Sequence, residues 1–216
     1  MKIDTLLFDL DGTLINTNEL IIASFLHTFE QYQPGTFTRE DVIEFIGPPL
    51  IDTFKKIAPD QAEAMIQTYR KFNHEKHDEL VEEYDGVYET IEQLHAQQYK
   101  LAVVTTKIKK TALMGLELTG LRKFFDVVIT LDDVEKAKPD PEPLVKALEA
   151  LGSTKETAMM IGDSEYDVQA GKNLGIPTAI VGWSIKGKEK IREYGADYIL
   201  DDMRDLLDIV GAKGHE

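Results

Sequence analysis

The sequence predicts an α/β protein, in which a doubly wound, Rossmann-like parallel sheet forms a core with an inserted small all-helical cap domain. Three observations lead to this prediction. An apolar, β-rich segment stands near the start of the chain, at residues 3–8. Residues 16–83 then carry helical patterns only. From residue 87 onward, short apolar segments alternate with helical ones, which is typical of βαβ units and of a parallel sheet covered on both faces.

The first strand is expected at residues 3–8, with a helix soon after it. The segment NTNEL supplies residues that favour a helix N-terminus. Apolar side chains then follow at the i, i+3, i+4 and i+7 spacing of one helix face, which predicts a helix packed against a core. These side chains are Ile22, Phe25, Leu26 and Phe29.

Further helices are expected before residue 84. The segment TRED, residues 38–41, has the spacing of a capping box and predicts a helix start, and the Gly-Pro-Pro segment at residues 47–49 is expected to stop that helix. Two more helical segments follow, at residues 50–57 and 60–81. We therefore expect a helical cap domain at residues 16–83, inserted into a core domain formed by residues 1–15 and 84–216.

The remaining strands are expected where short apolar segments end in polar turns. These segments read YKLAVVT, FFDVVIT, TAMMIG, PTAIVG and ADYIL, and most are followed by a helical pattern. We assign the strand at residues 3–8 to the same sheet, although the helical segment separates it from the others.

Composition limits the classes of partner and of chemistry. The chain has 24 basic and 39 acidic residues, and its net charge of −15 disfavours binding to nucleic acid or to an anionic membrane. It has no apolar run near the roughly 20 residues of a membrane span, and its first residues do not resemble a secretion signal. The absence of cysteine excludes disulfides, thiolate metal sites and a cysteine nucleophile, and we expect a reducing cytoplasm.

Polar side chains stand directly after several of the predicted strands. In an open parallel sheet the ligand binds beyond the carboxyl ends of the strands, so these side chains are the candidates for a site. They include carboxylates, hydroxyls and lysines. Together with the glycine of the first loop, the candidates in chain order are Asp9, Asp11, Gly12, Thr13, Thr105, Thr106, Lys107, Lys136, Lys138, Asp163, Ser164 and Asp167.

The carboxylates of this group predict a magnesium site. Asp9 and Asp11 stand one residue apart, and like charges held close together need a compensating cation. Asp163 and Asp167 add further oxygen ligands, and these loops contain no cysteine or histidine, which favours Mg²⁺ over a softer metal. Hydroxyls, a lysine and backbone N–H groups around such an ion suit phosphoryl transfer, in which an aspartate can be the nucleophile.

Four segments together resemble the ordered motifs of the haloacid dehalogenase-like hydrolase superfamily. They are FDLDGTL at residues 8–14, a threonine after the next core strand, KPDP at residues 138–141 and GDSEYD at residues 162–167. The helical segment after the first motif is similar to the small helical cap of that family, so the resemblance extends over the whole chain.

The resemblance implies catalytic roles for four residues. Asp9 is the expected nucleophile. Asp11 is expected to protonate the leaving group and then to activate water. Thr105 is expected to donate a hydrogen bond to the transferred phosphoryl group, and Lys138 to neutralise charge on that group and on Asp9.

The resemblance also implies a metal-ligand set and substrate contacts. Mg²⁺ is expected to be held by Asp9, Asp163 and the backbone carbonyl of Asp11, with Asp167 as an outer or alternate ligand. Besides Thr105 and Lys138, the substrate is expected to contact Gly12, Thr106 and the cap residue Gly47. The family often has asparagine where this chain has Thr106, so the role of that side chain stays open.

Other candidate residues have structural interpretations. We expect Lys107 and Lys136 to be solvated, and we assign no role to the five histidines. Trp183 follows a strand end, and packing in the core or at the rim of the site is its expected role.

Three function classes fit parts of this pattern: a hydrolase of small phosphate compounds, a phosphomutase and a phospho-accepting receiver domain. The DxDGT motif and the helical insertion argue against a receiver, whereas Asp11 is compatible with either enzyme. Within the family, the whole chain is most similar to bacterial pyrophosphatases associated with HPr kinase/phosphorylase, and only this resemblance implies a link to that enzyme. Phosphoglycolate phosphatases share the cap type, so pyrophosphate stays open as the substrate beside phosphoglycolate and other small phosphate esters.

Overall fold

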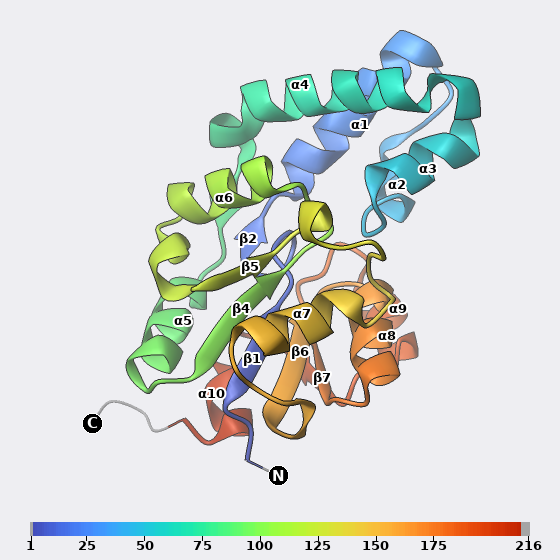
Figure 1. Cartoon of the computed structure of the whole chain (residues 1–216). Helices are drawn as coiled ribbons and strands as arrows, with labels where there is room; N and C mark the ends of the chain where they lie inside the picture. Colours follow the sequence, from blue (N-terminus) through green and yellow to red (C-terminus); the bar gives the residue numbers. More distant parts are fainter. Residues whose placement is uncertain (1, 213–216) are drawn as a thin grey trace.

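The computed structural model describes residues 2–212, and its centre is a parallel sheet (Figure 1). The strands lie in the order β5-β4-β1-β6-β7-β8, so the first strand of the chain occupies the middle. This arrangement confirms the predicted doubly wound core. The strands are β1 (Thr5–Phe8), β4 (Lys100–Val104), β5 (Val127–Ile129), β6 (Ala158–Gly162), β7 (Thr178–Val181) and β8 (Tyr198–Leu200).

Both faces of the sheet are buried, which explains the continuous apolar sequence of its central strands. Successive side chains of a strand point to opposite faces. In β1, Leu6 and Phe8 pack in one hydrophobic cluster and Leu7 packs in another. Helices α5, α6 and α10 contribute side chains to the first cluster, and α7 and α8 contribute to the second. The helices around the sheet are α5 (Val87–Ala96), α6 (Lys109–Leu118), α7 (Glu142–Ala150), α8 (Glu165–Leu174), α9 (Lys188–Glu193) and α10 (Asp205–Val210).

The inserted segment forms a separate helical layer at the top of Figure 1. Its hydrophobic cluster is rich in aromatic side chains, and the ring of Phe25 lies 5.0 Å from that of Tyr69 and 5.6 Å from that of Phe54 between centroids. This layer is the predicted helical cap. The exact domain boundaries after residues 15 and 83 stay a prediction. The cap helices are α1 (Asn18–Tyr32), α2 (Arg39–Glu44), α3 (Leu50–Ile57) and α4 (Ala62–Leu80).

A short antiparallel pair connects the cap to the core. Strand β2 (Ile15–Asn16) pairs with β3 (Glu82–Glu83), which brings the two chain segments at the base of the cap side by side. Two-residue strands carry no periodic pattern, so this pair could not be predicted from the sequence. Short 3₁₀ turns complete the fold at Pro59–Gln61, Leu121–Phe124, Leu131–Asp133 and Lys155–Thr157.

Several predicted boundaries differ from the structure. Thr38 and Asp41 form the expected capping box, but helix α2 ends at Glu44, before the Gly-Pro-Pro segment that was expected to stop it. Strand β5 is limited to Val127–Ile129, because the aromatic residues before it belong to a 3₁₀ turn and its exit. Within residues 2–212, none of the helices combines the length and apolar character needed to cross a bilayer.

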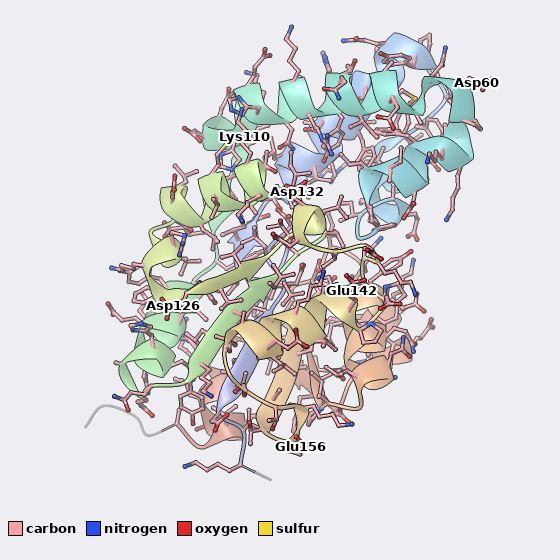
Figure 2. All side chains as sticks on the ribbon, viewed as in Figure 1. Asp60, Lys110, Asp126, Asp132, Glu142 and Glu156 are labelled. Atoms are coloured by element: carbon pink, nitrogen blue, oxygen red, sulfur yellow. The ribbon has the colours of Figure 1, made fainter. Side chains whose placement is uncertain are left out.

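The excess of acidic residues is spread over the surface. Asp60 lies on the cap, and Asp126 and Glu156 lie at separate places on the core, all with exposed side chains (Figure 2). An anionic ligand is therefore repelled by the surface as a whole, and its binding depends on cations placed locally in the site.

Candidate active site

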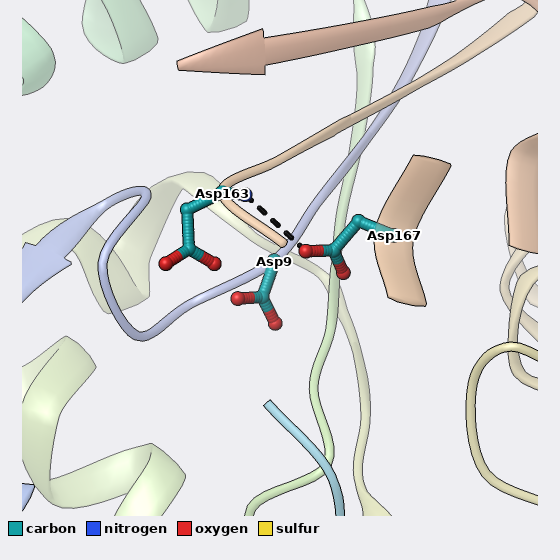
Figure 3. Close-up of side chains that lie close together, drawn as sticks. All are labelled: Asp9, Asp163 and Asp167. Carbon is teal, nitrogen blue, oxygen red and sulfur yellow. Dashed lines mark hydrogen bonds between the residues drawn. The ribbon is translucent and has the colours of Figure 1, made fainter. Parts of the chain in front are cut away.

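The carboxyl ends of β4, β1 and β6, which are neighbours in the sheet, bring several of the predicted residues to one place. Asp9 follows β1, Thr105 follows β4 and Asp163 follows β6. Asp167 reaches the same point from the first turn of α8. Figure 3 shows the carboxylates of Asp9, Asp163 and Asp167 side by side, and each offers an oxygen within 4.8 Å of the others.

Lys138 lies at the centre of this group and is almost completely buried. Its Nζ donates hydrogen bonds to Asp9 Oδ1 at 2.8 Å, to Asp167 Oδ1 at 2.6 Å and to the carbonyl of Val104 at 2.9 Å. Burial by itself would lower the pKa of Lys138, but the charges of Asp167 and Asp9 outweigh burial and raise the pKa. The ammonium group is therefore charged and fixed in position.

Asp167 has partners for both of its oxygens. While Oδ1 accepts from Lys138, Oδ2 accepts from the backbone N–H groups of Asp163 and Ser164, at 3.2 and 3.1 Å, and from the Ser164 hydroxyl at 2.7 Å. Asp167 is the third residue of a capping box at the start of α8, so the helix itself places it. A Cβ atom on Gly162 would come within 2.3 Å of the Asp167 carboxyl carbon, which explains the glycine there.

Asp9 and Asp163 are buried carboxylates with too little positive charge around them. Burial raises the pKa of Asp9 to about 7, although Lys138 acts against this, and the charge of Asp167 raises it further. Burial also raises the pKa of Asp163, and the charge of Asp9 adds to the effect. Among residues 2–212, no hydrogen-bond donor or cation is paired with the Asp163 carboxylate. An all-oxygen set with an excess of negative charge fits a hard divalent cation.

Gly12 allows Asp163 to approach the loop after β1. Its φ angle is +77°, and a Cβ atom would come within 2.4 Å of Asp163 Oδ2. Any side chain at this position would therefore displace the carboxylate, and glycine also tolerates the left-handed backbone conformation.

Asp11 is held by two donors. Lys107 Nζ and Thr17 Oγ1 each donate to Asp11 Oδ1 at 2.7 Å. The expectation that Lys107 is solvated is wrong, because its side chain is only 12% exposed and pairs with Asp11. Thr17 precedes α1 as expected for a helix cap, but its hydroxyl donates to Asp11 instead of accepting from the helix.

The two threonines after β4 have different partners. Thr105 Oγ1 accepts from the backbone N–H of Lys107 at 3.1 Å, which leaves the hydroxyl proton free for another acceptor. Thr106 Oγ1 donates to the carbonyl of Gly47 at 3.1 Å, so it connects the core to the cap.

A cavity of about 150 Å³ lies between these strand ends and the cap. This volume is small compared with the roughly 300–1,000 Å³ of typical small-molecule sites. Among the residues that line it, Asp9, Asp11 and Lys138 come from the core, and Gly47 and Arg70 come from the cap. Gly12 and Thr105 are not among the described residues that line this cavity, although both lie beside residues that do.

The loop after β7 contributes contacts that the sequence did not predict. The Ser184 hydroxyl donates to the backbone carbonyl of Asp163 at 2.7 Å. Lys186 Nζ donates to the carbonyl of Ile43, in the cap, at 2.5 Å, and Lys190, in the following helix α9, pairs with Glu44 at the same distance. This loop therefore supports Asp163 and fastens the cap; its position after a strand end was the available signal.

Trp183, Lys136 and His77, for which the sequence suggested no catalytic role, are not among the described residues that line the cavity. Trp183 packs against Tyr84, with 5.6 Å between the ring centroids. Lys136 is 72% exposed, as expected for a solvated lysine. His77 is completely buried in α4, and its Nδ1 lies 2.8 Å from Asp78 Oδ1.

Comparison with known families identifies the kind of protein to which this site belongs. The family model described as "Haloacid dehalogenase-like hydrolase" matches residues 6–181, which include every strand end of the site. The chain belongs to the haloacid dehalogenase-like hydrolase family. This result confirms the resemblance found in the sequence motifs.

Relatives within this family cover the whole chain. The sequence is 60% identical over 213 residues to the "Pyrophosphatase PpaX" of Halalkalibacterium halodurans, covering 99% of each chain. A Bacteroides fragilis structure described as a "Putative haloacid dehalogenase-like hydrolase" aligns with a TM-score of 0.88 at 25% identity, over 95% of this chain and all of that one. A Haemophilus somnus structure described as a "predicted phosphoglycolate phosphatase" aligns with a TM-score of 0.85 at 25% identity, over 97% and 98% of the two chains.

Proposed function

We propose that this hydrolase is a Mg²⁺-dependent phosphohydrolase that acts through an aspartyl phosphate and prefers inorganic pyrophosphate. The juxtaposition of Asp9, Lys138 and Asp163 at the strand ends carries the proposal for the chemistry. The proposal for the substrate is supported by the 60% identical relative, whose name states that activity, and by the small cavity. A cytoplasmic location and a link to HPr kinase/phosphorylase stay predictions from the sequence.

In the proposed first step, a carboxylate oxygen of Asp9 attacks phosphorus and the bond to the leaving phosphate breaks. Lys138 stays beside Asp9 and offsets the negative charge that is spread over the phosphoryl oxygens. Asp11 gives its proton to the leaving oxygen, and the bonds from Lys107 and Thr17 keep its carboxyl group oriented for this transfer.

In the second step, Asp11 accepts a proton from water, which attacks the aspartyl phosphate and releases phosphate and free Asp9. We expect Thr105 to donate its hydroxyl proton to the phosphoryl group, and this proton is free because the oxygen accepts from the backbone N–H of Lys107. Both oxygens of Asp167 already have partners, so its expected role is to hold the Lys138 ammonium in position.

Asp9, Asp163 and the backbone carbonyl of Asp11 are the groups that would hold Mg²⁺. The unpaired carboxylate of Asp163 and the raised pKa of Asp9 support this ligand set over one centred on Asp167. When bound, the ion supplies positive charge that draws the substrate phosphate toward the nucleophile.

A phosphoglycolate phosphatase is the second candidate function, and the structural similarity to the Haemophilus somnus protein supports it. Both candidates share the core chemistry and differ in the leaving group that the cap receives. Membership of the hydrolase family argues against a receiver domain.

A panel of phosphate compounds at equal Mg²⁺ tests the substrate. We expect kcat/KM for pyrophosphate to exceed that for phosphoglycolate, hexose phosphates and nucleotides, because a compact, highly charged substrate suits a small site and its phosphate leaving group needs less protonation than an alkoxide. A preference of about tenfold or more for phosphoglycolate, equal to about 1.4 kcal/mol in the transition state, would favour the second candidate instead.

Stability in the presence and absence of Mg²⁺ tests the metal site. The pKa of Asp9 is raised from its ordinary value of 3.8, which applies to the unfolded chain, to about 7 in the folded protein. Between pH 3.8 and about 7, the folded state therefore holds a proton that the unfolded chain has released. This proton stabilises the folded state, and its contribution disappears as the pH rises. In chelator, the melting temperature should therefore fall between about pH 5 and about pH 8, and less steeply in Asp9→Asn.

Added Mg²⁺ should have the opposite pH dependence. Because its ligands must be deprotonated, the rise in melting temperature that Mg²⁺ causes should be larger at about pH 8 than at about pH 5. Asp163→Ala should remove most of this rise. Hydrolysis at the full rate in excess EDTA would refute the metal site.

A further inference from the structure

We propose that Arg70, in cap helix α4, binds the anionic oxygens of the leaving group and thereby selects substrates whose leaving group is itself an anion. The inference rests on the proposed phosphohydrolase function and gives the cap side of the same cavity a role in binding the leaving group.

The cap wall of the cavity is largely apolar. Ile21, Phe25, Leu50 and Ile51 are among its side chains. Of the described cap residues that line the cavity, Arg70 alone carries a charge. A substrate group that extends from the core toward the cap therefore meets apolar side chains and one guanidinium.

The other cations at the cavity are already paired with core carboxylates. Lys138 binds Asp9 and Asp167, and Lys107 binds Asp11. Arg70 differs from them: it is partly buried, yet across residues 2–212 no hydrogen bond or ion pair satisfies its guanidinium. A partly desolvated cation without a partner is unfavourable, and an anion in the cavity would satisfy it.

Neighbours of Arg70 on α4 complete a polar patch on this wall. Tyr69 and Asn73 also line the cavity, and Asn73 lies one helical turn from Arg70. Asn73 Nδ2 is fixed by a hydrogen bond to Ser24 Oγ at 3.2 Å. The next residue, Lys71, is exposed and does not line the cavity. Arg70 faces the cavity because it lies on a different face of the helix from Lys71.

The geometry of the proposed reaction determines which part of the substrate faces each wall of the cavity. Attack by Asp9 is in line with the departing oxygen, so the leaving group lies on the side of phosphorus opposite to Asp9. Asp9 belongs to the core wall, and the leaving group therefore faces the cap wall, where Arg70 lies. A guanidinium binds two phosphate or carboxylate oxygens at once, which suits both a phosphate and a glycolate leaving group.

The test compares Arg70→Gln and Arg70→Lys with Lys71→Gln, which removes the same charge from the outer face of the same helix. With Mg²⁺ present, Arg70→Gln should lower kcat/KM for pyrophosphate by about 10- to 100-fold, the range of a hydrogen bond between charged groups. For p-nitrophenyl phosphate, whose leaving group carries no distal anion, the change should stay below about threefold. Arg70→Lys should recover part of the loss, and Lys71→Gln should behave as the unmodified protein.

Binding of methylenediphosphonate, a non-hydrolysable analogue, gives a readout besides activity. Its affinity in the presence of Mg²⁺ should fall in Arg70→Gln by a factor similar to the loss in kcat/KM, whereas inorganic phosphate should bind as before. Equal losses for pyrophosphate and p-nitrophenyl phosphate, or no loss for either, would overturn the proposal. Melting curves show whether each variant is folded.

The experiments distinguish an error in the proposed substrate from an error in the role proposed for Arg70. If the unmodified enzyme prefers phosphoglycolate, pyrophosphate is the wrong substrate. The same variants then test Arg70 with phosphoglycolate, whose leaving group also carries a negative charge. A selective loss there would support Arg70, and an unchanged kcat/KM would refute it.

Discussion

Replacement of Asp9 by Asn should reduce turnover by a factor on the order of 10⁴ or more while the protein stays folded. The amide has nearly the same shape as the carboxylate but cannot form the aspartyl phosphate. Lys138 keeps its bonds to Asp167 and the Val104 carbonyl, so the melting temperature should change little. Steady-state rates and a melting curve measure the two effects.

Asp11→Asn is the matched control for this experiment, because it also changes an aspartate of the first motif to its amide. With an activated leaving group, this variant should form phosphoenzyme and then stall, since water has lost its base. Rapid-quench labelling would detect the trapped intermediate. Turnover of Asp9→Asn close to that of the unmodified enzyme would remove Asp9 as the nucleophile.

Lys138→Met should reduce both stability and activity. The substitution leaves Asp9 and Asp167, both buried, without their shared cation. Loss of one partner from a buried ion pair typically costs about 3–5 kcal/mol, and we expect a decrease of that size in the free energy of unfolding near neutral pH. At about pH 5 the decrease should be smaller, because burial raises the pKa of Asp9 and its carboxylate takes up a proton there.

A second substitution separates the structural role of Lys138 from the catalytic one. Lys138→Met combined with Asp167→Asn removes one of the stranded charges, and part of the lost stability should return while hydrolysis stays absent. Lys136→Met, in the same loop but 72% exposed, should change neither property. An unfolding free energy for Lys138→Met equal to that of the unmodified chain would contradict the buried ion-pair arrangement.

The fold and the strand-end residues could be predicted because the signals for them are local. The apolar segment that became β1 and the motif after it stand together in the chain, and the position of Asp9 follows from the rule that ligands bind at the carboxyl ends of parallel strands. The capping box of Thr38 and Asp41 is likewise a spacing within one turn. The predicted catalytic and metal-binding roles still depend on the experiments above.

The partners of these residues depend on contacts between distant segments, which spacing does not encode. Lys107 looked like a solvated loop lysine until the fold placed it against Asp11, far away in the sequence. Thr17 has the sequence features of a helix cap, but the nearby carboxylate of Asp11 competes for its hydroxyl. Arg70 lies within a helix rich in polar residues, and only the packing of the cap on the core distinguishes it from Lys71.

The central place of β1 determines when the site can form during synthesis of the chain. Asp9 leaves the ribosome early, but β1 pairs on one side with β4, which begins at Lys100, and on the other with β6, which begins at Ala158. The cap helices, whose contacts are close in sequence, have all their residues available before either partner strand is made. A chain that stops between residues 138 and 158 would contain the proposed nucleophile and Lys138 but neither Asp163 nor Asp167. We therefore expect a chain that ends before Asp163 to be inactive, and hydrolysis to require synthesis of α8 and its Asp167.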